Sequence, residues 1–144
     1  ELNRQMSSVE RSEEFISLVV LVFDTEAETL RYASAGHPAT FLWHDREVRP
    51  LRSTGPLLML TSDGTYFSRE IPLARDDMAV MYTDGLAEAR NGDELFGEER
   101  IGDMVRRNPG IAPGVLCKQL LDAANDFSAG LVQDDLAILA VRKA

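Results

Sequence analysis

The sequence predicts an α+β domain in which short antiparallel strands come first and helices follow. Brief apolar or β-branched stretches recur between polar turns over residues 15–82. Apolar residues then recur at helical spacing over residues 98–107 and 113–127, before a last apolar strand at 136–141. Strands grouped before helices are typical of α+β proteins rather than of alternating α/β folds.

Composition narrows the classes of protein and of partner. The 144 residues suffice for one domain, and 44% hydrophobic with 27% charged residues is ordinary for a globular protein. The net charge of −9, with scattered Lys and Arg, disfavours nucleic acid and anionic membranes as partners. The longest apolar run, residues 18–23, is too short for membrane insertion, and the single Cys117 fits a reducing cytoplasm. Because the chain begins at Glu1 rather than at Met, we expect it to be a piece of a longer protein.

The N-terminal half predicts a helix followed by strands. Leu2, Met6 and Val9 share one helical face, so a polar lead-in helix is expected over residues 1–14. Residues 15–23 are almost continuously apolar, which predicts a central strand covered on both faces. Asp63-Gly64 resembles a hairpin turn. His44 lies beside a turn and is expected to be solvated. Further strands are expected at 29–34, 40–43, 47–51 and 65–73.

Residues 78–82 predict a buried strand that ends at a candidate metal ligand. Asp84 follows this strand and Gly85 follows Asp84, so a carboxylate stands at the strand end beside a residue without a Cβ. Such a carboxylate commonly holds Mg²⁺ or Mn²⁺. An Asp-Gly turn formed for conformational reasons alone explains the same residues.

The C-terminal third predicts two helices. Residues 98–107 place Ile101 and Val105 on one face and two arginines in the last turn, where cations suit the helix dipole. Pro113 suits the first turn of a second helix. Cys117 flanks the apolar stripe of that helix and is interpreted as a small core residue rather than a nucleophile.

Two further carboxylates, Asp134 and Asp135, precede the last predicted strand. If that strand is an antiparallel neighbour of strand 78–82, the end of one meets the start of the other. Neighbouring strands lie about 4.8 Å apart, so Asp84 and one of the pair would share a rim and a metal cluster. A divalent cation would neutralise carboxylates held so close together. Capping of a strand in solvent is the alternative, and spacing alone does not choose between them.

Five segments in order carry a resemblance to a known family. The combination of segments in this chain is highly specific: Ala-Gly-His-Pro, Tyr-Thr-Asp-Gly, Leu-Phe-Gly and a terminal Asp-Asp. The chain is similar, over about residues 15–142, to the C-terminal two-thirds of the SpoIIE/RsbU-type serine phosphatases. These are bacterial members of the metal-dependent protein phosphatase family related to protein phosphatase 2C. The segments are residues 32–38, 55–57, 82–90, 94–100 and 133–135.

This resemblance implies a protein phosphatase 2C-like αββα sandwich of two mostly antiparallel sheets flanked by helices. It implies a hydrolase that removes phosphate from phosphoserine or phosphothreonine on a partner protein, typically an anti-sigma-factor antagonist in bacterial signal transduction. Two Mn²⁺ or Mg²⁺ ions would activate the attacking water, with no catalytic residue beyond the metal ligands. Asp84 and Asp134 match the family's metal ligands. Asp135 and Gly85 are weaker candidates, as ligands or as neighbours of the ligands.

The chain also departs from the family pattern. The opening Asp-x-x-Gly-His-Gly segment, which supplies the bridging Asp, does not occur, so residues 1–144 are expected to form an N-terminally incomplete phosphatase domain. Leu58, Asp76 and Ala137 stand where Gly, Gly and Thr are usual. The alternative function is therefore a catalytically incomplete, phosphatase-like interaction module. Because absent strands would leave sheet edges open, the chain is also expected to form a homodimer or to exchange strands.

Overall fold

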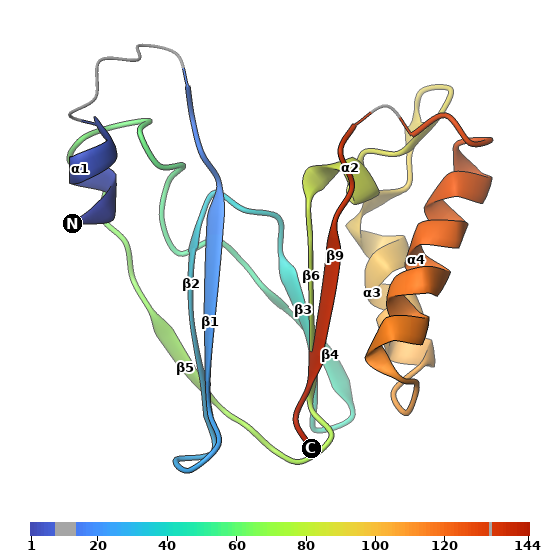
Figure 1. The fold of residues 1–144 in the computed structure, drawn as a ribbon, viewed down its shortest axis with the longest axis horizontal. Coiled ribbons are helices and arrows are strands. Elements are labelled where there is room, and N and C mark those ends of the chain that lie inside the picture. The colour runs from blue at the N-terminus through green and yellow to red at the C-terminus, as the bar shows by residue number, and fades with distance from the viewer. Residues whose placement is uncertain (8–13, 133) are drawn as a thin grey trace. The chain divides into compact units, whose positions relative to one another are not determined.

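The computed structural model describes residues 1–7, 14–132 and 134–144 (Figure 1). The chain divides into two compact units. Unit 1 comprises Glu1–His37 and Arg52–Leu73, and unit 2 comprises Pro38–Leu51 and Ala74–Ala144. Within the described residues, no helix is both long and apolar enough to span a membrane.

Unit 1 is built on a three-stranded antiparallel sheet. Its strands are β1 (Leu18–Asp24), β2 (Thr29–Ala35) and β5 (Arg69–Pro72), in the order β1-β2-β5. Strands β1 and β2 form an antiparallel hairpin, and its turn is held by Asp24 Oδ1, which accepts the N–H groups of Glu26 and Ala27.

Helix α1 (Leu2–Ser7) occupies the first part of the expected lead-in helix. The side chain of Asn3, which is 5% exposed, ties α1 to a loop of unit 1. Its amide donates to Thr61 O at 2.8 Å and accepts from Met59 N at 2.8 Å. Val9 lies outside the described residues, so they do not test its place on the helix.

Two predictions for unit 1 are wrong. Strand β1 is not covered on both faces, because Val20 and Val22 are 47% and 54% exposed. It is an edge strand that pairs, in the described part, with β2. The predicted strand at 65–73 shrinks to β5, which pairs with β2 instead of forming a hairpin across Asp63-Gly64. Both errors arise because local periodicity does not report which strands become neighbours. Homodimerisation or strand exchange stays a prediction, which sedimentation at high protein concentration would check.

Unit 2 is built on a four-stranded antiparallel sheet in the order β4-β3-β6-β9. Figure 1 shows two helices, α3 and α4, together on one side of this sheet. The strands and helices are β3 (Thr40–His44), β4 (Glu47–Leu51), β6 (Met78–Tyr82), β9 (Ile138–Arg142), α3 (Gly97–Arg107) and α4 (Pro113–Phe127).

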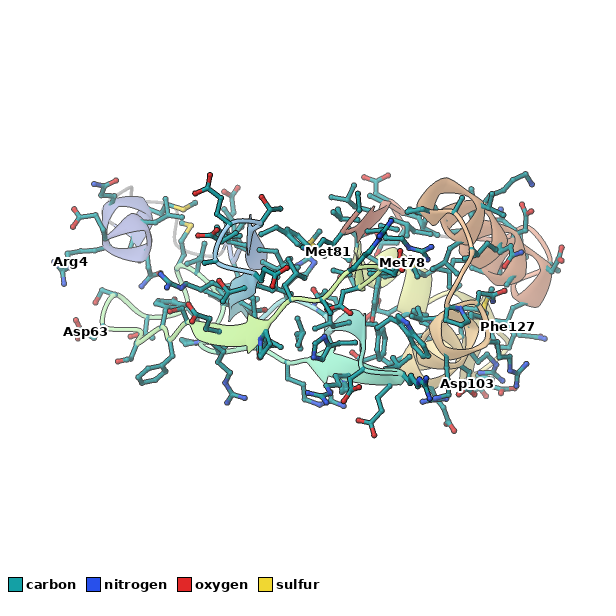
Figure 2. The ribbon with its side chains drawn as sticks, turned by 90° about the horizontal axis from the view of Figure 1, so that it is seen from below. Arg4, Asp63, Met78, Met81, Asp103 and Phe127 are labelled. Atoms are coloured by element: carbon teal, nitrogen blue, oxygen red, sulfur yellow. The ribbon has the colours of Figure 1, made fainter. Side chains whose placement is uncertain are left out.

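The core of unit 2 lies between the sheet and these helices. Val80 on β6, Ile101 on α3 and Leu120 on α4 are fully buried. Met78 and Phe127, labelled in Figure 2, belong to the same apolar cluster. The helical spacing predicted these buried faces, and α3 carries the expected acidic first turn and basic last turn.

Arg100 joins three elements of unit 2. Its guanidinium donates to the carbonyls of Leu95 and Phe96 at 3.0 and 2.9 Å, pairs with Glu94, and lies 4.7 Å from the centre of the Phe127 ring. It thereby connects the start of α3 to the end of α4. It also reaches the small hairpin of β7 (Arg90–Asn91) and β8 (Glu94–Leu95).

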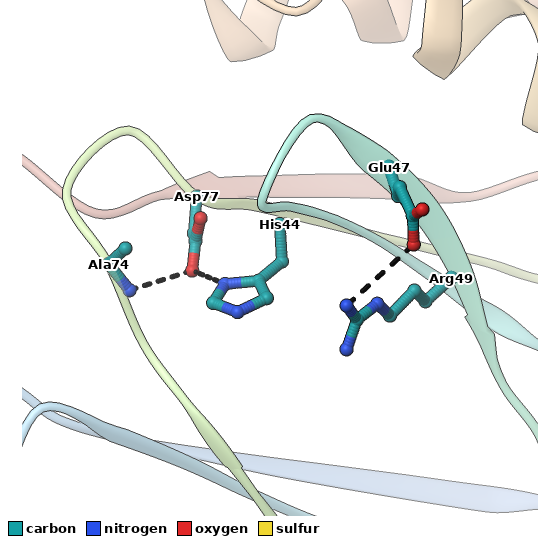
Figure 3. A network of polar contacts seen from close by, with 5 residues as sticks. All are labelled: His44, Glu47, Arg49, Ala74 and Asp77. Atoms are coloured by element: carbon teal, nitrogen blue, oxygen red, sulfur yellow. Dashed lines mark hydrogen bonds and ion pairs between the residues drawn. The ribbon is translucent and has the colours of Figure 1, made fainter.

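A buried carboxylate–imidazole pair closes one end of the sheet in unit 2 (Figure 3). Asp77 Oδ2 accepts hydrogen bonds from His44 Nδ1 at 2.6 Å and from Ala74 N at 2.7 Å. The two side chains are 13% (His44) and 5% (Asp77) exposed, so the expectation that His44 is solvated is wrong. Asp76, which directly precedes Asp77, has φ +67°, a left-handed conformation that favours glycine. Glycine is the usual residue at this position in the family that the sequence resembles.

Candidate metal centre

The opposite end of the same sheet carries the predicted metal ligands. Strands β6 and β9 are antiparallel neighbours, with Tyr82 opposite Ile138, which is the arrangement on which the hypothesis of a shared metal site depended (Figure 1). The pairing continues one step further, because Thr83 N donates to Ala137 O at 3.0 Å. The segment after β6 therefore lies beside the segment before β9, although Gln133 is outside the described residues.

Thr83 fastens these two segments together. Its Oγ1 accepts the N–H of Ala137 at 2.9 Å and donates to Asp135 O at 3.2 Å. One side chain thus fixes both ends of the turn into β9. Since Thr83 directly precedes Asp84, the same hydroxyl sets the position of Asp134-Asp135 relative to the Asp84 backbone.

Gly85 is required by a close approach of the chain to itself. A Cβ built there would lie 2.4 Å from Asp135 O and 3.3 Å from Asp134 O. The sequence suggested a glycine that admits a sharp turn or a ligand, and the backbone of the Asp134-Asp135 segment occupies that space instead. Because Gly85 packs directly against the Asp135 carbonyl, the segment of Asp84 and the segment of Asp134-Asp135 lie together at one end of the sheet.

A short helix that the sequence did not predict follows β6. Helix α2 (Asp84–Ala87) begins at Asp84 itself, and its backbone is closed by the Glu88 N–H donating to Asp84 O at 2.8 Å. Four residues leave no room for a periodic pattern, so no sequence signal distinguishes this turn of helix from a loop.

The carboxylates of Asp84, Asp134 and Asp135 are exposed. The only side-chain interaction described among them is local: Asp134 Oδ1 accepts the Asp135 N–H at 3.2 Å. Within the described residues, no group of three or more His, Cys, Asp and Glu side chains is placed to hold a metal ion. The donors nevertheless fit Mg²⁺ or Mn²⁺ chemically, because a hard cation binds carboxylate oxygens and often keeps several waters beside one or two such ligands.

A small hollow opens beside this rim. It has a volume of about 70 Å³, and Asp134 forms part of its wall, whereas Asp84 does not. This hollow could not be predicted from the sequence, because its wall combines α2, the β7 strand and the loop after α4. Its lining residues are Gly85, Glu88, Ala89, Arg90, Leu131 and Asp134.

The Ala-Gly-His-Pro segment has a structural explanation within unit 1. Gly36 has φ +59°, and a Cβ there would lie 2.6 Å from Leu57 Cδ2, so only glycine fits. His37 Nδ1 lies 2.9 Å from Ser17 Oγ, at hydrogen-bond distance. This contact gives His37 a structural role in unit 1 that requires no bound metal ion.

Gly85→Ala is expected to lower the free energy of unfolding by about 1–3 kcal/mol, because the new methyl group would force the Asp135 carbonyl away. The same shift would lower Mn²⁺ affinity by roughly 10- to 100-fold, the effect usual for residues that position ligands. Urea denaturation and a Mn²⁺ titration measure the two effects.

Gly114→Ala is the matched control, since a Cβ at Gly114 would meet nothing within 4 Å. In the first turn of α4 it is expected to stabilise by up to about 1 kcal/mol. Equal changes in the free energy of unfolding and in Mn²⁺ affinity for the two variants would contradict the close approach at Gly85.

Solved structures similar to this chain define its class. The SiaA-PP2C domain of Pseudomonas aeruginosa matches with a TM-score of 0.85 and 21% identity, over 99% of this chain and 58% of that one. The phosphatase domain of SpoIIE from Bacillus subtilis, presoaked with Mn, matches with a TM-score of 0.70 and 16% identity, over 96% and 62%. The fold is therefore that of a protein phosphatase 2C-like domain, and the predicted α+β class with antiparallel sheets is confirmed.

The family follows from sequence. The family model described as Stage II sporulation protein E (SpoIIE) matches residues 1–144, so the chain belongs to the SpoIIE family. The phosphoserine phosphatase RsbU of Bacillus subtilis is 22% identical over 144 residues, which cover 99% of this chain and 43% of that protein. The chain thus spans less than half the length of this relative.

Proposed function

We propose that the chain acts as a metal-dependent protein phosphatase domain. Its reaction would be hydrolysis of phosphoserine or phosphothreonine on a partner protein such as an anti-sigma-factor antagonist. The observation that carries this proposal is the β6–β9 pairing, which places the segments of Asp84 and Asp134 at one rim. The RsbU relative, a phosphoserine phosphatase, supports the reaction class.

Asp84 and Asp134 would hold the cation, Mn²⁺ or Mg²⁺, through carboxylate oxygens. When bound, such a cation supplies a nucleophile from water at neutral pH and stabilises charge on the phosphoryl oxygens. Thr83 would keep the two acidic segments in register through its two hydrogen bonds. The net reaction consumes one water, breaks the bond between phosphorus and the serine oxygen, and releases inorganic phosphate.

A second candidate is a catalytically incomplete module that binds a partner protein and performs no chemistry. One observation favours it: the described residues offer no group of three or more ligating side chains. Two carboxylates alone would hold a cation weakly, since each lost ligand lowers affinity. Catalysis and metal binding must therefore be measured separately.

The test is phosphate release from a phosphoserine peptide by the 144-residue chain, with Mn²⁺, with EDTA, and with Mn²⁺ added back in excess. We expect release with Mn²⁺, none with EDTA, and recovery on re-addition. Mn²⁺ binding without phosphate release would favour the interaction module. Release that is unchanged by EDTA would contradict the metal-dependent reaction.

A further inference from the structure

Arg90 forms part of the wall of the hollow at the acidic rim, together with Asp134. Its side chain is exposed, whereas the residue before it, Ala89, is buried. The hairpin fixes its backbone, because Arg90 pairs with Leu95 and the Phe96 N–H donates to Ala89 O at 2.8 Å. The backbone of Arg90 is therefore held in place by the β7–β8 hairpin, while its guanidinium is exposed beside Asp134, a candidate metal ligand.

The guanidinium of Arg90 has no hydrogen bond or ion pair with another side chain in the described part of the protein. Two arginines elsewhere in this acidic chain show the alternative, because each is paired with a carboxylate: Arg31 with Glu70 at 2.8 Å, and Arg100 with Glu94. Glu88 shares the hollow with Arg90 and is not paired with it in the described residues. A guanidinium that lines a hollow and has no carboxylate partner among the described residues favours an external anion.

We infer that Arg90 binds the phosphoryl group of the phosphorylated side chain in this hollow. The inference rests on the proposed phosphatase function and names a substrate-binding residue for it. Arginine presents paired N–H donors that match two phosphoryl oxygens, which lysine does not reproduce. The volume of about 70 Å³ is enough for several water molecules and hence for a phosphoryl group.

Charge explains why the rim needs such a residue. A phosphate ester carries negative charge, and the carboxylates of Asp134 and Glu88 in the hollow repel it. A cation on Asp84 and Asp134 would offset part of this repulsion. Arg90 lines the same hollow and offsets a further part of this repulsion, whether or not a metal ion is bound.

Leu131 gives the hollow an apolar wall and is 70% exposed. The residues on either side of a phosphoserine would add apolar contacts with this side chain that free phosphate cannot make. The two sources of the same phosphoryl chemistry are therefore separable by experiment.

The experiment measures binding of a phosphoserine peptide to the 144-residue chain in EDTA, with its unphosphorylated form as reference and inorganic phosphate as competitor. Arg90→Gln is expected to weaken phosphopeptide binding by about 10- to 100-fold, with only partial rescue in Arg90→Lys. Arg75→Gln is the matched control, because Arg75 is exposed and lies outside the lining of the hollow. It should bind as the wild type does. Leu131→Ser should weaken peptide binding and leave phosphate competition unchanged.

The outcomes separate this inference from the proposed function. Equal phosphopeptide affinity in the wild type and Arg90→Gln overturns the inference, as does a wild type that does not prefer the phosphorylated peptide. Mn²⁺-dependent turnover that persists in that case leaves the phosphatase function standing. Arg90-dependent binding without turnover supports the inference and refutes the phosphatase activity. With active enzyme, Arg90→Gln should raise KM while Mn²⁺ affinity stays unchanged.

Discussion

Asp84→Asn is expected to lower kcat/KM for Mn²⁺-dependent hydrolysis of a phosphoserine peptide by at least about 100-fold. The side chain of Asp84 is exposed at the rim where β6 ends beside the start of β9. Asparagine keeps the size of the side chain but replaces an ionised oxygen with a neutral amide, which binds a divalent cation more weakly than a carboxylate does. The measurement is initial phosphate release over a range of Mn²⁺ concentrations.

The fold of this variant should be unchanged, because the described structure gives the Asp84 carboxylate no hydrogen bond that asparagine would break. A thermal melt within about 1 °C of the wild type would show this. Asp63→Asn is the matched control, an exposed carboxylate in unit 1. Full activity in Asp84→Asn, or an equal loss in Asp63→Asn, would refute the role assigned to Asp84.

Asp77→Ala is expected to lower the free energy of unfolding by about 2–5 kcal/mol. The substitution removes the acceptor of two hydrogen bonds, from His44 Nδ1 at 2.6 Å and from Ala74 N at 2.7 Å. The His44 donor that remains is largely shielded from water, since the His44 side chain is 13% exposed. Urea denaturation with a common m-value measures the difference.

Two variants make this prediction specific. Asp77→Asn retains an acceptor oxygen without the charge and should lose less stability than Asp77→Ala. Asp93→Ala removes an exposed carboxylate from the β7–β8 turn and should stay within about 0.5 kcal/mol of the wild type. A loss below about 1 kcal/mol in Asp77→Ala would mean that the buried pair contributes little to stability.

The sequence predicted best the features that depend on local residue patterns. Polar turns on both sides bound β4 and β6, and both strands occupy the predicted residues 47–51 and 78–82. The last strand begins at Ile138, two residues later than predicted. The rim was predictable because only one assumption was needed, that β6 and β9 are antiparallel neighbours.

Features that depend on tertiary contacts were not predictable. Nothing near His44 in sequence indicates Asp77, which the β3–β6 pairing brings to it. The residue that requires glycine at position 85 is likewise far away in sequence, since the carbonyl that excludes a Cβ belongs to Asp135. Strand β1 has the composition of a covered strand, and only its place at the sheet edge exposes Val22.

The central claim is that Asp84 and Asp134 bind one and the same divalent cation. The most direct measurement is a Mn²⁺ titration, followed by the electron paramagnetic resonance signal of free Mn²⁺, on the wild type, Asp84→Asn, Asp134→Asn and the double variant. Each single substitution should weaken binding by about 10- to 100-fold, and the double variant should lose less than the sum of the two losses in binding free energy. Single variants that bind Mn²⁺ like the wild type, or losses that add fully in the double variant, would contradict a shared ion.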